Sequence, residues 1–566
     1  MSSVTPDQLR SATWDEIVAL YQPLLDASLD RDDPEVIEQW LAAWSNLDAA
    51  LQEAAVLAMM ASAADVNDAK SGTIHQRFDG EIMPRHKEIL VALAAKLLDS
   101  GYTRPDLETT IQRFRIDREI FRTENIPLQQ RLSALKERYN NVCGNMTVDW
   151  QGESIPPSRL NRFLQDPDRN VRESAWRASF QPYVDQRDTL ADIFDEMLEL
   201  RQRIARNAGF SNYRDYAFTE LHRVDYTPDD CRTFHESTRA TFVPATTRIM
   251  DAHRQALGVD SLRPWDLDAD PEQRPAPEPL PSIDALTDAA ANAVRRVDPT
   301  FGDQFDGLRE RGLLDLDSRA GKRPGGFCFP LAWQKQATIF MNSSASPLDL
   351  TILLHESGHA FHEISMANLP IVHQRAVGEE MCEVASMSME LLALPYLHRD
   401  KGGVYADDDY AMVRREHINH VLTRFPWIAV VDAFQHWLYT DPAATDRDAR
   451  DRKFVEIWAE YDPHTNWTGL DDLRTARWYK QLHIFLYPFY YIEYGLAQLA
   501  AVQVWRNAQH DPETALADLR AAFALGGTKP LPELYARAGA RMIFDEAGMS
   551  DLVNLVVNET EKSAIR

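Results

Sequence analysis

The sequence predicts a mainly α-helical protein with one or two small β-sheets. Apolar residues recur at spacings of three and four along most of the 566 residues, as they do in amphipathic helices. Alternation of apolar and polar residues is rare, and neither a strand–helix–strand rhythm nor a repeat of fixed period is visible. The chain is also long enough, with 44% hydrophobic residues, to bury a large core without disulfides.

The helical patterns begin at Asp33 and Pro34, a pair typical of an N-cap residue followed by proline in the first turn. Trp40, Trp44 and Leu51 then fall on one face of a helix, which we expect to be buried. Similar patterns run through residues 85–99, 106–140, 170–207, 228–257 and 283–297.

Two segments interrupt these helices. Residues 264–281 contain six prolines, and the apolar Trp265 among them favours an ordered surface loop over a linker between domains. The sequence GKRPGGF at 321–327 ends the preceding helix. ATIFMN at 337–342 is then the clearest strand candidate, either as an ordinary core strand or as an edge strand that pairs with an extended ligand.

The charge and cysteine content narrow the class of protein. Sixty basic against 87 acidic residues give a net charge of -27, which disfavours binding to nucleic acid or to anionic membranes. The four cysteines are scattered without a Cys-x-x-Cys pair, a pattern that fits a reducing compartment. The first residues, MSSVTPDQLR, lack the apolar run of a signal peptide, and no stretch approaches the roughly 18 apolar residues of a membrane span. We therefore expect a cytoplasmic globular protein.

The segment TILLHESGHAFHEI, which starts at Thr351, contains the metal-binding pattern H-E-x-x-H. On a helix, His355 and His359 lie one turn apart on the same face, so both imidazoles can reach one metal ion. Glu356 points about 100° away from His355 and is placed to act on a metal-bound water. Gly358 allows another backbone to approach closely. The pattern predicts a zinc site.

A third metal ligand must come from elsewhere in the chain. In one class of zinc enzymes the third ligand follows H-E-x-x-H in the same segment, which here would require glycine at 362 and histidine at 365. The chain has His362 and Ser365 at these positions, so this longer pattern is absent. The run GEEMCEVASMSMELL at 378–392 offers four carboxylates instead, and its spacing alone does not choose among them: Glu379, Glu380, Glu383 and Glu390. Two neutral histidines and one carboxylate would leave zinc an open position for an activated water, which is the chemistry of amide hydrolysis with Glu356 as general base.

These residues resemble a known family. HESGHAFH followed by CEVASMSME is similar to the thimet oligopeptidase and oligoendopeptidase F family of zinc metallopeptidases, and closer to its oligoendopeptidase F branch. The segments at 200–218, 223–228, 321–328 and 524–539 are similar as well, so the likeness spans about residues 200–545. The resemblance implies Glu383 as the third ligand of one zinc ion. Of the other carboxylates, Glu379 and Glu390 are expected to orient the ligand histidines.

The segment HIFLYPFYYIEYGLAQLAA at 483–501 is by itself typical of a buried aromatic helix. The resemblance implies that His483, Tyr491 and Tyr494 lie over the zinc, with Tyr494 stabilising the oxyanion and the other two assisting or binding substrate. The family's glycine-rich stretch after the histidine is replaced here by Phe485-Leu486-Tyr487-Pro488, so Tyr490 is an alternative to Tyr491.

The resemblance further implies two helical lobes around a deep substrate channel, with a small β-sheet near the zinc site. We expect an N-terminal helical region at 1–200 and a catalytic domain at 201–566. The expected function is a zinc endopeptidase that cleaves short, extended oligopeptides, whose backbone would pair with the strand at 337–342. An exopeptidase of the same fold and a noncatalytic peptide-binding relative are the alternatives.

Overall fold

The computed structural model describes residues 4–564 except 273, 275 and 276, and the side chains of residues 4–560 with the same gaps. It is 73% helical with 5% strand, which confirms the predicted class. The helices are α1 (Pro6–Ser11), α2 (Trp14–Asp26), α3 (Pro34–Ala64), α4 (Ala69–Arg77), α5 (Met83–Ser100), α6 (Glu108–Ile120), α7 (Ile126–Gly144), α8 (Arg169–Asp185), α9 (Arg187–Asn207), α10 (Tyr213–Glu220), α11 (Pro228–Leu257), α12 (Ile283–Val297), α13 (Pro299–Glu310), α14 (Pro347–Met366), α15 (Glu379–Ala393), α16 (Asp407–Thr440), α17 (Arg447–Tyr461), α18 (Asp471–Lys480), α19 (Leu482–Leu486), α20 (Tyr491–His510), α21 (Pro512–Leu525), α22 (Leu531–Arg537) and α23 (Glu546–Ala564). The strands are β1 (Val148–Trp150), β2 (Glu153–Ile155), β3 (Leu314–Asp317), β4 (Gly326–Leu331) and β5 (Gln336–Ser343).

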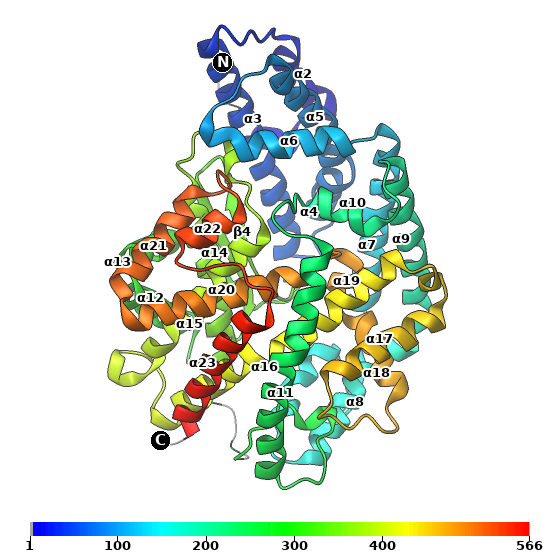
Figure 1. The fold of residues 1–566 in the computed structure, drawn as a ribbon, viewed down its shortest axis with the longest axis vertical. Helices are drawn as coiled ribbons and strands as arrows, with labels where there is room; N and C mark the ends of the chain where they lie inside the picture. Colours follow the sequence, from blue (N-terminus) through cyan, green and yellow to red (C-terminus); the bar gives the residue numbers. More distant parts are fainter. Residues whose placement is uncertain (1–3, 273, 275–276, 565–566) are drawn as a thin grey trace.

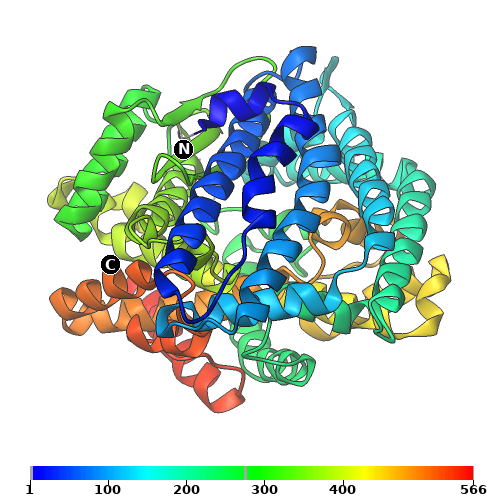
Figure 2. The ribbon, with the colours of Figure 1, turned by 90° about the horizontal axis from the view of Figure 1, so that it is seen from above.

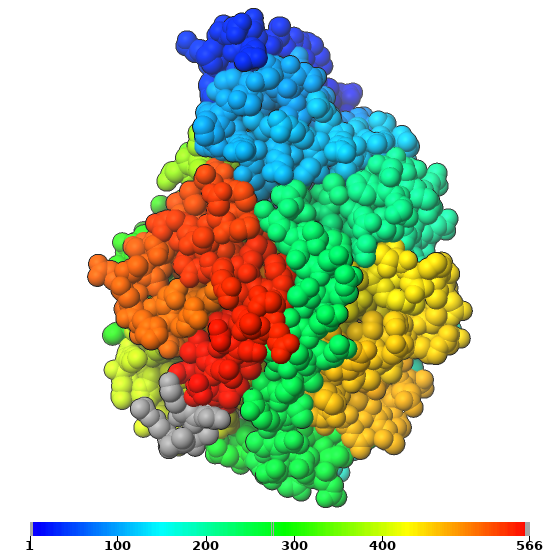
Figure 3. Space-filling model, in the orientation of Figure 1, coloured from blue at the N-terminus to red at the C-terminus, as the bar shows by residue number. Residues whose placement is uncertain are grey.

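The N-terminal helices gather at one end of the long axis of the molecule (Figure 1). Seen from above, these blue helices lie across the centre of the view, beside the cyan helices that follow them (Figure 2). In the space-filling view the green helix α11 runs between the red C-terminal segment and the yellow helices (Figure 3). Segments far apart in the sequence are therefore neighbours in space.

Two large groups of buried apolar side chains hold these helices together. One group takes its members from Leu9 to Phe114, with Ile371 from the later chain, and the other runs from Ile120 to Val556. Asp33 caps α3 as its sequence suggests, with Pro34 in the first turn. The boundary placed at residue 200 stays a prediction.

The helical pattern at 106–140 is divided into α6 and α7 in the structure. Phe121 takes an extended conformation, and Pro127 lies in the first turn of α7, because proline starts a helix more readily than it continues one. The ranges predicted at 228–257 and 283–297 coincide with α11 and α12. In the proline-rich segment Trp265 is buried, while residues 273, 275 and 276 lie outside the described part.

The strand predicted at 337–342 is present as β5 but lies in the middle of its sheet. The strand order is β3-β5-β4, with β5 parallel to β3 and antiparallel to β4. Both edges of β5 are therefore occupied by neighbouring strands, so the expectation that substrate pairs with 337–342 is wrong. Strand order depends on contacts distant in sequence, and here it leaves β4 as the edge strand on that side.

The N-terminal helices are joined to this sheet by polar contacts. Glu53 on α3 accepts hydrogen bonds at 2.9 Å from the backbone amides of Trp333 and Gln334, in the turn between β4 and β5. The amide of Arg323 donates to the Ala63 carbonyl at 2.8 Å. Because Glu53 is nearly fully buried, this contact fixes the hairpin to α3.

A second joint between the N-terminal helices and the rest of the chain is centred on Asp48. This carboxylate is fully buried and lies 2.7 Å from the hydroxyl of Tyr21, 3.1 Å from Nε2 of His86 and 2.7 Å from Nε2 of His373. Although burial opposes ionisation, the two histidines hold the pKa of Asp48 well below its usual range. His373 thus has a structural role in this joint.

Among the described residues one helix, α3, is long and apolar enough to cross a membrane by length and composition. This differs from the expectation that no stretch approaches a membrane span. In its most apolar window 44% of the residues are buried inside the protein, and Trp40 and Trp44 belong to the core. Such burial is common in the core helices of proteins that do not enter membranes.

Candidate active site

The H-E-x-x-H pattern lies on α14, whose start is fixed by its own sequence. Ser346 caps the helix and Asp349 returns a hydrogen bond to the cap, with Pro347 in the first turn. A Cβ atom on Gly358 would lie 2.5 Å from the carbonyl oxygen of Ala385 on α15. The glycine therefore allows the close approach of α15, as the sequence analysis expected, and brings the carboxylates of α15 to the histidines.

The structure brings together His355, His359 and Glu383. Their nearest ligand atoms all lie within 4.8 Å of one another, and Oε2 of Glu383 is 3.5 Å from Nε2 of His355 and 3.8 Å from Nε2 of His359. Of the four carboxylates that the sequence left open, Glu383 is thus the one that faces both imidazoles.

These three side chains have further partners that fix their direction. His355 Nδ1 lies 2.6 Å from Oε1 of Glu390, and His359 hydrogen-bonds the backbone of Cys382. The hydroxyl of Ser386 donates to Oε2 of Glu383 at 2.9 Å. Partners of this kind orient metal ligands, so the donor set of two imidazole nitrogens and one carboxylate fits a zinc ion.

Burial and neighbouring charges shift the pKa values in opposite directions. Burial opposes protonation of His355, but the hydrogen bond and charge of Glu390 outweigh it and raise the pKa of His355 to about 9. Burial lowers the pKa of His359 to about 4. For Glu356, burial and the charges of Glu383 and Glu390 raise the pKa to about 7, so this carboxyl group can exchange a proton near neutral pH.

The aromatic residues predicted to lie over the zinc form one group of rings. The ring of His483 lies 4.8 Å from that of Tyr491 and 5.9 Å from that of Tyr494, and burial lowers the pKa of His483 to about 4. Burial and the charge of Glu383 raise the pKa of Tyr494. The hydroxyl of this tyrosine is therefore protonated and can donate a hydrogen bond.

Tyr490, the alternative to Tyr491, makes the direct contact with the candidate ligand. Its hydroxyl donates to Oε1 of Glu383 at 3.0 Å, whereas the hydroxyl of Tyr491 hydrogen-bonds Trp427 and Gln481. Phe489 has a φ of 66°, and this left-handed turn between α19 and α20 presents Tyr490 to Glu383. A simple helical pattern through 483–501 does not predict such a turn.

Other candidates from the sequence lie apart from the ligand atoms. His362 is 1% exposed and its ring packs 5.0 Å from that of Phe523, so it does not face substrate. Glu390 contacts His355, whereas Glu379 hydrogen-bonds Tyr490 and makes no hydrogen bond or ion pair with either ligand histidine in the described part of the chain. Burial raises the pKa of the Cys382 thiol, so this thiol stays protonated and unreactive.

Two residues that contact or influence Glu390, His417 and Arg424, were not predicted from the sequence. His417 Nε2 lies 3.7 Å from Oε2 of Glu390, and the charges of His417 and Arg424 help to lower the pKa of Glu390 to about 2 against the effect of burial. Both residues lie on α16, and no metal-ligand spacing connects them with the H-E-x-x-H pattern. Only the tertiary fold, in which α16 packs against α20 and α20 packs against α15, brings them to the site.

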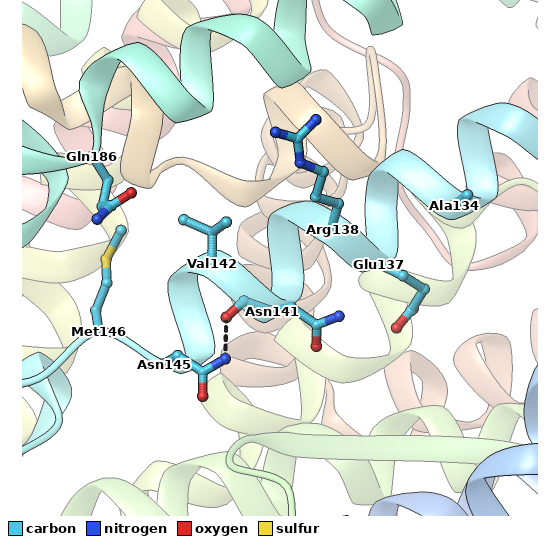
Figure 4. A pocket seen from close by; sticks show the side chains of 8 residues that line it. All are labelled: Ala134, Glu137, Arg138, Asn141, Val142, Asn145, Met146 and Gln186. Carbon is cyan, nitrogen blue, oxygen red and sulfur yellow. Dashed lines mark hydrogen bonds between the residues drawn. The ribbon is translucent and has the colours of Figure 1, made fainter.

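A separate pocket opens between α7 and the start of α9 (Figure 4). Its eight lining residues include Glu137, Arg138, Asn141 and Gln186, but no histidine, cysteine or aromatic residue. The pocket contains none of the candidate catalytic residues.

Comparisons with known proteins agree with this fold. The chain is 21% identical over 387 residues to an oligoendopeptidase F homolog of Borreliella burgdorferi, an alignment that covers 67% of this chain and 63% of that relative. The chain thus matches less than two thirds of the relative's length. The structure resembles PZ peptidase A with an inhibitor, with a TM-score of 0.90, 24% identity, and 97% and 98% of the two chains covered.

A second solved structure, described as an oligoendopeptidase F, has a TM-score of 0.89 and 26% identity, and covers 97% of each chain. The resemblance seen in the motifs therefore extends over the whole fold. The model of peptidase family M3 matches residues 162–553, well over half of the chain, and the protein belongs to peptidase family M3.

Proposed function

We propose that the protein is a zinc-dependent endopeptidase that hydrolyses internal peptide bonds of short oligopeptides. The observation that carries this proposal is the convergence of His355, His359 and Glu383 beside Glu356. A zinc ion held by these three ligands would act as a Lewis acid that activates water and polarises the peptide carbonyl. The remaining steps depend on side chains of the protein.

Glu356 is the proposed general base and acid. Its carboxylate accepts a proton from the attacking water and then donates this proton to the leaving amine nitrogen. The pKa of about 7 suits both transfers, because the group can hold or release a proton near neutral pH. A hydrogen bond from the backbone amide of Cys328 on β4 favours the ionised form and holds the carboxylate beside the sheet.

Three aromatic side chains are proposed to act on the substrate. Tyr494 keeps its phenolic proton and would donate it in a hydrogen bond to the oxyanion that develops on the carbonyl oxygen. His483 and Tyr491, whose rings touch, would bind or position the peptide beside it. Tyr490 would hold Glu383 in place through the hydrogen bond between their side chains.

Strand β4 is the proposed docking site for the peptide backbone. It is an edge strand, and Glu356 hydrogen-bonds the backbone of Cys328 on this strand. A peptide added along this edge would lie next to Glu356 in an extended conformation. Folded proteins do not present such a segment, which supports short oligopeptides as substrates. The proposed channel between helical lobes and the cytoplasmic location remain predictions.

A quenched fluorescent peptide blocked at both ends tests the proposal. Cleavage at an internal bond supports an endopeptidase, whereas an exopeptidase needs a free terminus and would leave this peptide intact. Glu356→Gln should lower kcat by at least about a thousandfold, since it removes the proton acceptor. Glu363→Gln is the matched control on the same helix. Within the described part of the chain Glu363 makes no hydrogen bond or ion pair with the three proposed ligands, so this variant should retain activity.

A further inference from the structure

A second cluster of potential metal ligands lies between α11 and α16. Each helix contributes two side chains separated by one turn, Cys231 and His235 from α11 and Asp432 and His436 from α16. Residues four apart share a helix face, so the two pairs meet where the helices pack. The ligand atoms of Cys231, Asp432 and His436 all lie within 4.8 Å of one another.

The polar atoms of this cluster are buried and incompletely paired. Asp432 is fully buried, and its Oδ2 accepts a hydrogen bond at 2.8 Å from Nε2 of His235. Nε2 of His436 is 3.3 Å from the same oxygen, but neither this nitrogen nor Oδ1 of Asp432 has a well-formed hydrogen bond within the described part of the chain. A buried carboxylate oxygen without a partner is costly, and a bound cation would satisfy it.

Aromatic rings pack against the two histidines of the cluster. The rings of Phe218 and Phe489 lie 5.8 and 5.4 Å from that of His436, and the ring of Phe234 lies 6.3 Å from that of His235. In such an apolar surrounding an unpaired charge costs more than it does near the surface, and attraction to a cation is stronger. The surroundings therefore favour a bound ion over a solvated acidic group.

We propose that Cys231, Asp432 and His436 bind a second zinc ion, with His235 orienting the carboxylate of Asp432. The thiol of Cys231 loses its proton to solvent on binding, as metal-bound cysteines do. One thiolate, one carboxylate and one neutral imidazole then cancel the two positive charges of the ion, which suits a buried site. Sulfur, nitrogen and oxygen donors together fit zinc, whereas calcium and magnesium prefer oxygen donors.

The position of this cluster gives the second ion a structural role. The ring of Phe489 packs on His436, and the Phe489 amide donates to Oε1 of Gln435 on α16 at 2.8 Å. The next residue, Tyr490, contacts Glu383. A metal ion bound at His436 would therefore stiffen the support of the left-handed turn that presents Tyr490 to the candidate active site.

Metal content of the full-length protein tests the proposal without measuring activity. The protein is stripped with a chelator, reconstituted with zinc alone, dialysed and analysed for zinc per chain. We expect two equivalents in the unmodified chain, one in Cys231→Ala and one in His359→Gln. Cys328→Ala is the matched control, because it removes a different thiol, on β4 near Glu356, that is a proposed ligand of neither ion. This variant should keep both zinc equivalents.

Cobalt in place of zinc gives an independent signature, because a thiolate ligand produces a charge-transfer absorption band in the near ultraviolet. The band should persist in His359→Gln and disappear in Cys231→Ala. A single zinc equivalent that His359→Gln removes completely would overturn the proposal, and so would a band that survives Cys231→Ala. If Cys231→Ala does not fold, His359→Gln alone decides: one zinc with a thiolate band supports the second site, and no bound metal rejects it.

Discussion

The contact between Glu390 and His355 predicts how strongly the proposed zinc ion is held. Glu390→Gln keeps the shape of the side chain but removes the negative charge 2.6 Å from Nδ1 of His355. A hydrogen bond to a charged group contributes about 1.5–3 kcal/mol and a neutral one about 0.5–1.5 kcal/mol, so the loss is about 1 kcal/mol. Changes to such outer partners weaken metal sites about 10- to 100-fold. We therefore expect about tenfold weaker zinc binding at pH 7.5.

Competition with a chromophoric chelator measures this affinity directly. Glu363→Gln is the control, because it makes the same Glu-to-Gln change at another carboxyl group of α14, one that has no hydrogen bond or ion pair with a ligand imidazole in the described part of the chain. Circular dichroism of both variants should match that of the unmodified protein. The reasoning would be refuted if Glu390→Gln bound zinc within twofold of the unmodified protein. It would also be refuted if Glu363→Gln lost as much zinc affinity as Glu390→Gln.

Three further substitutions test other contacts. Tyr490→Phe removes the hydrogen bond to Glu383 and should weaken zinc binding about threefold to tenfold, measured by the same competition. Gly358→Ala places a Cβ atom 2.5 Å from the Ala385 carbonyl, so it should separate α14 from α15, lower the Tm and weaken zinc binding. Asp48→Asn should destabilise the protein by about 3–5 kcal/mol at pH 7, measured by urea unfolding. Because the pKa of Asp48 is lowered in the folded state, its contribution exists above the unfolded pKa of about 3.9 and is lost below it, so the difference between variant and parent should shrink in acid.

Each of these three predictions has an outcome that contradicts it. Tyr491→Phe, which keeps the contact to Glu383, should bind zinc like the parent, and a larger effect there than in Tyr490→Phe would reverse the two roles. An unchanged Tm in Gly358→Ala would contradict the second prediction, because it would mean that α14 and α15 can move apart without loss of stability. If the difference in unfolding free energy between Asp48→Asn and the parent grew in acid, the predicted pH dependence of the Asp48 contribution would have the wrong sign.

The amphipathic spacing was sufficient to predict most of the fold. Helices α11 and α12 begin and end where their patterns do, because capping residues and apolar faces are local signals. The place of β5 in the middle of its sheet was not predictable, since β3 and β4 reach it through contacts that no local pattern encodes. The break at Phe121 was missed because the apolar spacing continues across it.

The same distinction separates the parts of the candidate site. His355 and His359 follow from helix geometry alone, whereas Glu383 required the family resemblance, because four carboxylates share its segment. Tyr490 was predicted only as an alternative to Tyr491. The left-handed turn at Phe489 shifts the helical register there, and the spacing of the residues does not predict this turn. The cluster at Cys231 and Asp432 combines residues 201 positions apart, so only the packing of α11 on α16 reveals it.

The most direct test of the proposed function is Glu356→Gln examined for both turnover and bound zinc. The variant should bind as much zinc as the parent, because Glu356 is not a ligand, and it should cleave the doubly blocked peptide at least about a thousandfold more slowly. Turnover close to that of the parent would contradict the role of Glu356 as proton acceptor. A parent protein that cleaves the peptide without any bound metal would contradict the metal site itself.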